Sequence, residues 1–303
     1  MEKVAIVTIT YNSESVLVPF FDSLLKQTYT NIKLYVIDNA STDNTLKIID
    51  RYNSNNMFLI KNTRNEGVAK ANNQGIKQAL NDGCNHIVIA NNDIEFESDL
   101  VLRLLKKKTK YNASIISPKI MYYDRPDLIW YAGAWFIKNK GYLPLHKGIN
   151  EVDNGQYNHV LTVEYAPTCF LLIDKEVFKD IGYMDEKYFV YFDDTDFLYR
   201  IWKNGKHKTI IDTSVKIYHK VGSLTKSFNS KGKKIYRGNF FLRQNIRNHV
   251  YFLRKTGTMF SYLYIIWLLI LNNIKFFIKP NIQKNLKTWV LINTSYFKGL
   301  LLK

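Results

Sequence analysis

The chain has 303 residues, and a hydrophobic content of 46% is enough for one large core or two modest ones. It contains no internal repeat and no low-complexity linker, which excludes repeat architectures. The two cysteines, Cys84 and Cys169, lie too far apart in sequence to form a metal or redox motif, which suits a reducing compartment.

The net charge of +17 is concentrated in the last third of the chain. Residues 201–303 carry 20 Lys and Arg but only one acid, Asp212, whereas residues 1–200 carry 23 Lys and Arg and 25 Asp and Glu. The first part therefore has the balance of an ordinary enzyme domain. The last part predicts an anionic partner: phospholipid, a pyrophosphate-bearing substrate or nucleic acid. No signal peptide is expected, because the N-terminus leads directly into a strand-like run.

The first 90 residues alternate between strand and helix patterns. Apolar runs and helical periodicity predict strands at 4–10, 33–37, 57–60 and 86–90, with helices at 13–27, 44–52 and 68–80. This alternation indicates a mainly parallel sheet with right-handed crossovers. Such sheets bind ligands at the carboxyl ends of their strands. Polar residues at three of those ends predict a ligand crevice there: Thr10, Tyr11 and Asn12, then Asp38 and Asn39, then Asn91, Asn92 and Asp93.

The middle of the chain continues the α/β pattern less regularly. A helix is predicted at 98–111 and a strand at 115–121, followed by hairpins and loops over 122–165 that are expected to cover the site. Further strands are predicted at 170–173, 208–211 and 215–219. Helices are predicted at 176–181 and from near the acidic residues of 191–197 to Gly205.

After residue 231 the sequence becomes basic and aromatic. The segment 259–271 is almost wholly apolar, but it is shorter than the roughly 20 residues that a membrane-spanning helix needs. Extended to residue 278 it approaches that length, although Asn272, Asn273 and Lys275 interrupt it. Flanking cations and interfacial aromatic residues favour a helix that lies in one leaflet. A helix buried against the catalytic part and a true membrane span are the alternatives.

An acidic cluster, residues 191–197, places Asp193, Asp194 and Asp196 within four positions between aromatic residues. Carboxylates this close repel one another, and aromatic neighbours that exclude water raise a carboxyl pKa toward the range of a general base. The alternative is an ordinary helix start, because Asp is favoured in the first turn.

Several segments together resemble the family-two glycosyltransferases, inverting enzymes with the GT-A fold, and especially the bacterial branch of rhamnosyltransferases and other surface-polysaccharide enzymes. The resemblance covers about residues 3–255, and the order and spacing of its motifs are specific. The matching segments are 7–12, 36–43, 65–75, 91–93, Ala132-Gly133, 178–185, 191–196, and His219 with Ser223.

The resemblance implies a GT-A catalytic domain over residues 1–230, with a nucleotide-binding part at 1–120 and an acceptor-binding part at 121–230. A basic, aromatic helical region that associates with membranes would follow at 231–303. Asp38 would accept a hydrogen bond from the pyrimidine ring, the alternative being an Asx-turn in its own loop. The nucleotide-binding residues implied are Thr10, Tyr11, Asn12, Asp38, Asn39, Gly67, Asn72, Asn91 and Asn92.

The resemblance also implies a divalent metal, Mg²⁺ or Mn²⁺, on the pyrophosphate of the sugar nucleotide. Asp93 would be the principal carboxylate ligand, since Asn91 stands where many relatives have an acid. His219 matches a histidine that helps bind the metal or phosphate in related enzymes, although a single histidine is also commonly structural.

The acidic cluster takes the catalytic role in this resemblance. Asp194 matches the general base, and Asp193 stands where the family has Glu. Arg243, Arg247 and Asn248 match an Arg-Asn element of the family. The two arginines are candidates for contacts with acceptor or phosphate, the alternative being a solvated basic face.

The expected function is therefore metal-dependent, inverting transfer of a sugar from dTDP-rhamnose or a UDP-hexose to a polyprenyl-pyrophosphate-linked glycan. Such an enzyme would build O-antigen or capsule at the cytoplasmic face of the cell membrane as a peripheral protein. A nucleotidyltransferase is the first alternative, but residues 11–15 contain neither Gly nor Arg for a phosphate loop. A basic membrane- or nucleic-acid-binding protein is the second; no nucleic acid partner is expected, because no recognised motif for one is present.

Overall fold

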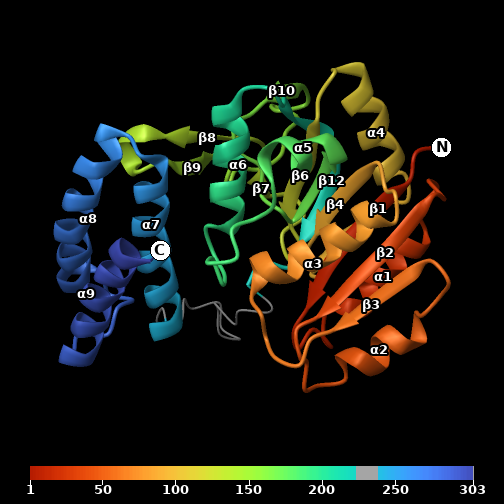
Figure 1. The fold of residues 1–303 in the computed structure, drawn as a ribbon. Coiled ribbons are helices and arrows are strands. Elements are labelled where there is room, and N and C mark those ends of the chain that lie inside the picture. The colour runs from red at the N-terminus through yellow and green to blue at the C-terminus, as the bar shows by residue number, and fades with distance from the viewer. Residues whose placement is uncertain (223–237, 303) are drawn as a thin grey trace.

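The computed structural model describes residues 1–222 and 238–302 of the chain (Figure 1). The predicted alternation of strands and helices in the first 90 residues is confirmed. The first helix begins four residues later than predicted. The residues before it form a loop that is stabilised by side chain–backbone hydrogen bonds, such as Tyr11 N–H to Ser13 Oγ at 3.1 Å. The elements are β1 (Val4–Thr10), α1 (Leu17–Leu25), β2 (Ile32–Asp38), α2 (Thr45–Arg51), β3 (Met57–Lys61), α3 (Val68–Asn81) and β4 (His86–Ala90).

The middle of the chain adds the second half of the sheet and a hairpin. The two strands predicted at 208–211 and 215–219 form one long strand with a register shift between Asp212 and Lys216. The elements are β5 (Ile94–Phe96), α4 (Leu100–Lys110), β6 (Ile115–Tyr122), β7 (Ile129–Tyr131), β8 (Ala134–Ile137), η1 (Lys138–Lys140), β9 (Leu143–His146), β10 (Val160–Thr162), β11 (Phe170–Asp174), α5 (Lys175–Ile181), α6 (Asp193–Asn204) and β12 (Thr209–His219).

The main sheet is mixed and mostly parallel, with helices on its faces (Figure 1). Its strand order is β10-β12-β6-β11-β4-β1-β2-β3, with β5 paired to β12 and β7 paired to β6. Strands β1, β2, β3 and β4 run parallel, whereas β11 is antiparallel to both β4 and β6. Every residue of β4 is buried, as expected for a strand covered on both faces.

Strand register brings distant polar residues to one edge of the sheet. Thr10 lies opposite Asp38 at the carboxyl ends of β1 and β2. At the end of β12, His219 pairs with Ile94 of β5, so the histidine reaches the residue that precedes β5, Asp93. The predicted crevice at the strand ends therefore also receives a residue from the far end of the sheet.

Three C-terminal helices stand beside the sheet-containing part, at the left of Figure 1. They are α7 (Asn239–Thr256), α8 (Met259–Ile278) and α9 (Leu286–Leu301). Helices α7 and α9 approach closely at Gly299, where a Cβ atom would lie 2.4 Å from the carbonyl oxygen of Arg247. The predicted domain boundary at residue 230, and Ser223, lie outside the described residues.

Helix α8 carries its more apolar side outward. It is long and apolar enough to cross a membrane by length and composition, yet only 28% of its most apolar window is buried. Its buried residues include the polar Ser261 and Asn272. The large apolar residues exposed on α8 are Met259, Tyr262, Leu263, Ile266, Trp267, Ile270, Ile274, Phe277 and Ile278.

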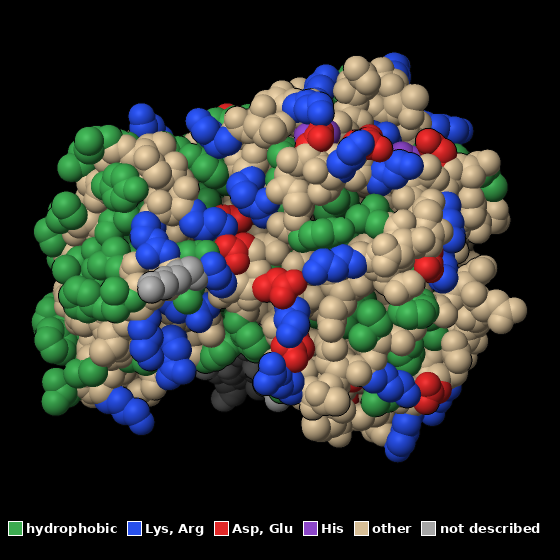
Figure 2. Space-filling view, viewed as in Figure 1, with side chains coloured by type: hydrophobic (Ala, Val, Ile, Leu, Met, Phe, Trp, Pro, Cys, Tyr) green, Lys and Arg blue, Asp and Glu red, His purple; other side chains and the backbone are tan. Residues whose placement is uncertain are grey.

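Helix α9 repeats this arrangement. Thr288, Ser295 and Gly299 are buried, whereas Trp289, Val290 and Phe297 are exposed. Hydrophobic side chains accordingly gather over α8 and α9 (Figure 2). This surface, which we call the α8–α9 apolar face, argues against the alternative of a helix buried on the catalytic part.

Candidate active site

Asp38 is held rigidly at the end of β2. Its carboxylate accepts hydrogen bonds from Thr10 Oγ1 at 2.8 Å, Ser41 Oγ at 2.5 Å and Ser41 N–H at 3.0 Å, and only 1% of the residue is exposed. The structure thus shows the alternative role of Asp38, which is to stabilise its own loop. A nucleotide base would have to share this carboxylate with Ser41, so the base contact of Asp38 stays a prediction.

Tyr11 and Asn12 extend from the end of β1. Asn12 adopts a left-handed backbone (φ 50°) and its Oδ1 accepts from Thr42 N–H at 2.8 Å. Within the described residues no such hydrogen bond holds the Tyr11 side chain, and the residue is 48% exposed. An exposed aromatic ring at the carboxyl end of a parallel strand is suited to stacking on a nucleotide base.

Asn39, Gly67 and Asn72 lie around the start of α3. Asn39 is buried and its Nδ2 donates to the Gly67 carbonyl at 3.2 Å. Gly67 (φ 85°) permits a close approach, but the approach is to Phe189, whose carbonyl oxygen lies 2.6 Å from where a Cβ would be. Asn72 is also buried, with Nδ2 3.8 Å from Met184 Sδ. The structure thus gives Gly67 and Asn72 a packing role against residues 184–189.

Asn91 and Asn92 form the turn after β4. Asn92 is buried and ties this turn to β1, since its Nδ2 donates to Ile9 O at 2.8 Å and Ser13 Oγ at 2.9 Å. Asn91 is exposed, with its N–H bonded to Cys169 O at 2.9 Å and its Nδ2 3.6 Å from Cys169 Sγ. Asn91 is the amide of this pair that faces outward.

Asp93 and His219 meet as the register of β5 and β12 requires. His219 Nε2 lies 3.3 Å from Asp93 Oδ1, and its Nδ1 lies 3.7 Å from Cys169 Sγ. Burial lowers the pKa of His219, but the neighbouring Cys169 and Asp93 outweigh it and hold that pKa well above its usual value. The two side chains that sequence analysis assigned to a metal are therefore adjacent.

The donor set of this pair would fit a divalent ion that is completed by phosphate only when the ion displaces the proton from His219 Nε2, because a neutral imidazole is the ligand. The 3.3 Å between His219 Nε2 and Asp93 Oδ1 would let one nitrogen and one oxygen reach the same ion. Among the described residues, no group of three or more His, Cys, Asp or Glu could hold a metal. A carboxylate and an imidazole alone would bind weakly, and diphosphate oxygens would supply the remaining ligands.

Asp194 stands in the first turn of α6 after an unusual backbone. Tyr191 (φ 66°) and Phe192 (φ 69°) are both left-handed, which non-glycine residues rarely adopt and which clusters at functional sites. Asp194 Oδ2 accepts from the Tyr165 hydroxyl at 2.6 Å and Oδ1 from Thr195 N–H at 2.6 Å. Burial, followed by the charge of Asp194, raises the pKa of Tyr165 well above its usual value, so the phenol keeps its proton and donates.

Asp193 differs from Asp194 in environment. It is 5% exposed, and burial followed by the charge of Asp194 raises the pKa of Asp193 from 3.8 to about 8. Burial thus favours the neutral form of Asp193, which lessens the repulsion within the pair.

A continuous row of aromatic contacts joins the Asp93–His219 pair to Asp194. The Trp130 ring contacts His219 at 5.2 Å and His146 at 5.1 Å between centroids, and His146 contacts Tyr165 at 5.9 Å. Tyr165 in turn donates to Asp194. The predicted metal ligands and the predicted base are thus joined by one chain of packed side chains.

Sequence analysis missed Trp130, His146, Tyr165 and Cys169. The first three lie in 122–165, where the pattern was least regular, and they come from β7, β9 and the segment before β11. An isolated bridge between Ala134 and Tyr165 pins the tyrosine to β8. The only signal available was the density of aromatic residues in a segment expected to cover the site.

Arg243 and Arg247 lie on α7, away from the strand ends. Arg243 is exposed. Arg247 Nη2 donates to the Lys187 carbonyl at 3.1 Å, and its Nε donates to Asn248 Oδ1 at 2.8 Å. Arg247 thus holds the loop before α6, and the contacts of both arginines with acceptor or phosphate stay predictions.

Comparison with known proteins gives the family. The family described as "Glycosyl transferase family 2" matches residues 5–182. The dTDP-rhamnosyl transferase RfbF of Shigella flexneri is 31% identical over 217 residues, 71% of this chain and 68% of its own. The UDP-Glc:alpha-D-GlcNAc-diphosphoundecaprenol beta-1,3-glucosyltransferase WfaP of Escherichia coli is 37% identical over 79 residues, 26% of this chain and 32% of its own.

Solved structures share the fold. Residues 1–349 of Staphylococcus aureus TarS, in complex with UDP-GlcNAc, superpose with a TM-score of 0.62 at 16% identity, covering 98% of this chain and 81% of that one. Other similar structures hold Mn²⁺ with a nucleotide or nucleotide sugar. The predicted GT-A arrangement, a mainly parallel sheet between helices, is confirmed.

Proposed function

The chain belongs to glycosyl transferase family 2, and we propose that it moves a rhamnosyl or hexosyl group from a nucleotide sugar to a lipid-linked glycan with inversion. The observation that carries this proposal is the row from the Asp93–His219 pair through Trp130 and His146 to Asp194. In this proposal the leaving diphosphate and the attacking hydroxyl lie at opposite ends of that row.

Asp194 acts as the general base. Its carboxylate takes the proton of an acceptor hydroxyl as that oxygen attacks the anomeric carbon, and the bond from this carbon to the diphosphate breaks with its electron pair leaving on the nucleotide. A single in-line displacement inverts the anomeric configuration. Tyr165 orients the carboxylate of Asp194 through its 2.6 Å hydrogen bond.

Asp93 and His219 would hold the divalent ion against the diphosphate of the donor. When bound, such an ion neutralises charge on the leaving group. Cys169 lies against His219 and Asn91 and fixes the orientation of both side chains. The contact with the buried Cys169 limits the movement of the imidazole when the donor enters.

The names of relatives support the class of substrate. RfbF is named for a dTDP-rhamnosyl donor and WfaP for a UDP-glucose donor and a diphosphoundecaprenol-linked acceptor. We propose a dTDP- or UDP-linked sugar, its base stacked on Tyr11, and a polyprenyl-pyrophosphate-linked acceptor in the synthesis of a surface polysaccharide such as O-antigen or capsule.

We propose that the protein is peripheral on the inner face of the cell membrane. The α8–α9 apolar face would enter the lipid interface, and the exposed lysines of the same segment, Lys279, Lys284, Lys287 and Lys298, would meet anionic headgroups. A lipid-linked acceptor lies at that surface, so the position of the enzyme and the nature of its acceptor support one another. Nucleic acid is not an expected partner.

The direct test replaces the base. With Mg²⁺ or Mn²⁺, dTDP-rhamnose or UDP-hexoses and a polyprenyl-pyrophosphate-linked glycan, we expect the Asp194→Asn variant to lose transfer by at least about 100-fold, since a general base contributes about 10²–10⁴-fold. Binding of UDP or dTDP, measured by thermal shift, should be unchanged, because the predicted nucleotide contacts lie at strand ends whereas Asp194 lies on α6.

Asp50→Asn, an exposed acid-to-amide change on α2, is the matched control and should retain full transfer. Undiminished transfer by Asp194→Asn would remove Asp194 as base. Release of pyrophosphate from a nucleoside triphosphate, in place of transfer, would favour the nucleotidyltransferase alternative.

A further inference from the structure

We propose that Asn248 of α7 is a positioning residue for the transfer reaction, because it holds the left-handed turn from which Asp194 is presented. This inference rests on the proposed function in assigning Asp194 as the base. The contacts themselves are independent of that assignment. They are made by α7, which lies beyond residues 5–182 that the family model matches and within residues 3–255, where the sequence resembles the family.

Asn248 is completely buried and every polar group of its side chain is used. Nδ2 donates to the Val190 carbonyl at 2.9 Å and to the Tyr191 carbonyl at 2.8 Å, while Oδ1 accepts from Arg247 Nε at 2.8 Å. A primary amide has two N–H donors, and both point at successive carbonyls of one turn. No other amino acid supplies these two donors and the acceptor at this length.

The turn that Asn248 holds is the one that aims the base. Tyr191 and Phe192 are left-handed at φ 66° and 69°, and α6 begins at the next residue, Asp193. Residues other than glycine keep this backbone conformation only where surrounding contacts impose it. If the turn relaxed, the first turn of α6 would rotate and Asp194 would leave the Tyr165 hydroxyl.

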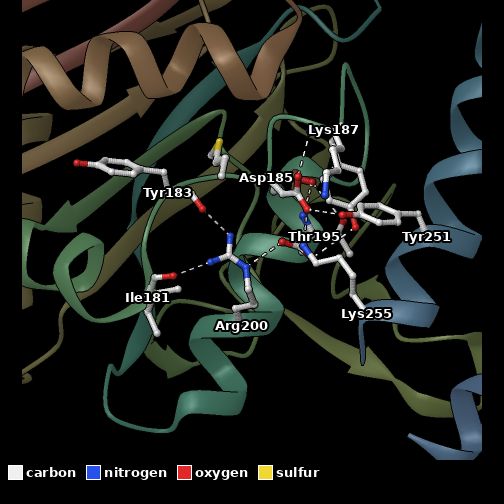
Figure 3. A network of polar contacts seen from close by, with 12 residues as sticks. Ile181, Tyr183, Asp185, Lys187, Thr195, Arg200, Tyr251 and Lys255 are labelled. Atoms are coloured by element: carbon white, nitrogen blue, oxygen red, sulfur yellow. Dashed lines mark hydrogen bonds and ion pairs between the residues drawn. The ribbon is translucent and has the colours of Figure 1, made fainter. Parts of the chain in front are cut away.

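Other residues of α7 contact the chain on both sides of this turn, between residues 185 and 196. The Phe192 ring stacks on His249 with centroids 5.1 Å apart and planes inclined by 26°. Lys255 bridges Asp185 and Asp196 at 2.7 Å each, and Tyr251 donates to Asp185 at 2.9 Å. Figure 3 shows this network, in which Arg200 also bonds the carbonyls of Ile181 and Tyr183.

Asn248 is therefore placed to affect the chemical step more than donor binding. Its bonds reach Asp194 through three peptide units, whereas the predicted nucleotide residues Thr10, Tyr11 and Asp38 lie at the carboxyl ends of β1 and β2 or directly after them. A displacement of about 1 Å at a reacting group costs up to about 100-fold in rate. The effect should appear in kcat, with the KM for the donor unchanged.

The test compares Asn248→Ala with Asn245→Ala. Asn245 is on the same helix, and its Nδ2 donates only within α7, to Phe241 O at 3.1 Å, so it controls for a general effect on the helix. We expect kcat of Asn248→Ala to fall about 10- to 100-fold, with unchanged donor KM and unchanged thermal shift by UDP or dTDP. Asn248→Asp, which turns an oxygen toward two carbonyl oxygens, should lose more.

Hydrogen exchange separates this inference from the proposed function. The amide of Asp196, bonded to Phe192 O at 2.9 Å, and its neighbours over 190–196 should exchange at least about tenfold faster in Asn248→Ala but not in Asn245→Ala. This readout needs no activity, so it decides the matter even if the wild-type protein shows no transfer. Unchanged exchange at 190–196, or equal loss of kcat and nucleotide binding in Asn248→Ala, would overturn the positioning role.

Discussion

At the scale of single residues, Asp193 and Asp194 are neighbours in sequence, but their carboxyl groups differ in burial and in hydrogen bonding. Asp193 is buried beside a charge, and its raised pKa of about 8 keeps it neutral at pH 7. Asp194 is only partly buried and accepts bonds from Tyr165 and Thr195. The same residue type thus supplies a neutral neighbour and a proton acceptor.

The pKa of Asp193 predicts a pH dependence of stability. Between its ordinary value of 3.8 and about 8, the folded protein holds a proton that the unfolded chain has lost. The free energy of unfolding should therefore fall as pH rises through this window, by no more than about 1.4 kcal/mol per pH unit from this group. Asp193→Asn cannot titrate, so its stability relative to wild type should grow by at least about 1 kcal/mol from pH 5 to pH 8.

Urea unfolding across that pH range measures this difference. Asp50→Asn, an exposed acid on α2, should give a curve parallel to wild type. A curve for Asp193→Asn that is also parallel to wild type would show that Asp193 is ionised in the folded protein.

Asp93, His219, Asp193 and Asp194 were predicted from the resemblance to a known family, and the structure places Asp93 against His219 and Asp194 against Tyr165. Tyr165 and Trp130 were not, because their roles come from strand pairings between segments with no local pattern. Gly67 shows the converse: it was predicted to bind the nucleotide, but its close neighbour in the structure is Phe189.

At the scale of elements, alternation of strands and helices predicted the nucleotide-binding half of the sheet. The register shift that lets β12 run continuously through residues 212–216 was not predictable, since a bulge interrupts the apolar pattern like a loop. That shift matters for the site, because it carries His219 to the strand end beside Asp93.

The contact between α7 and α9 makes an element-scale prediction. In Gly299→Ala the new Cβ would lie 2.4 Å from Arg247 O and 2.8 Å from Val250 Cβ, so α9 must move away from α7. Helix propensity alone would make alanine stabilising by about 1 kcal/mol, whereas overpacking costs about 1–3 kcal/mol. Because the clash involves backbone, we expect net destabilisation and a melting temperature lower by several degrees.

The control for this change is Gly238→Ala at the N-cap of α7, where an added Cβ meets none of the described residues within 4 Å. Thermal unfolding of both variants decides between the two effects. A Gly299→Ala protein as stable as wild type would mean that α7 and α9 are less closely apposed than described, and the support of α7 for the turn before Asp194 would then need another source.

At the scale of the whole molecule, charge and hydrophobicity divide along the chain. The sequence predicted a basic, aromatic helical region after residue 231, and within residues 238–302 the structure places it as a separate layer (Figure 1). Which side of α8 faces outward could not be predicted, because both sides are apolar enough to bury. The structure turns Ser261 and Asn272 inward and leaves the large apolar side chains outside.

An outward apolar face predicts binding to membranes by insertion rather than by charge alone. Ile266 and Ile270 on α8 are 64% and 48% exposed, so replacing both with Ser should leave the melting temperature unchanged. Burying each isoleucine in lipid would contribute up to about 1.5–3 kcal/mol, so we expect the double variant to partition at least about tenfold less onto vesicles containing anionic lipid. Vesicle flotation measures this directly.

The matched control replaces Val18 and Leu25, which are exposed aliphatic residues on α1, with Ser, and should float as wild type does. Salt separates the two contributions to binding. High ionic strength screens the lysines around α8 and α9 but not the apolar contact, so wild type should keep part of its binding at 1 M salt, where the Debye length is about 3 Å. If salt abolished the binding, or the Ile266/Ile270 variant floated like wild type, the α8–α9 apolar face would not be the membrane contact, and another partner would have to cover it.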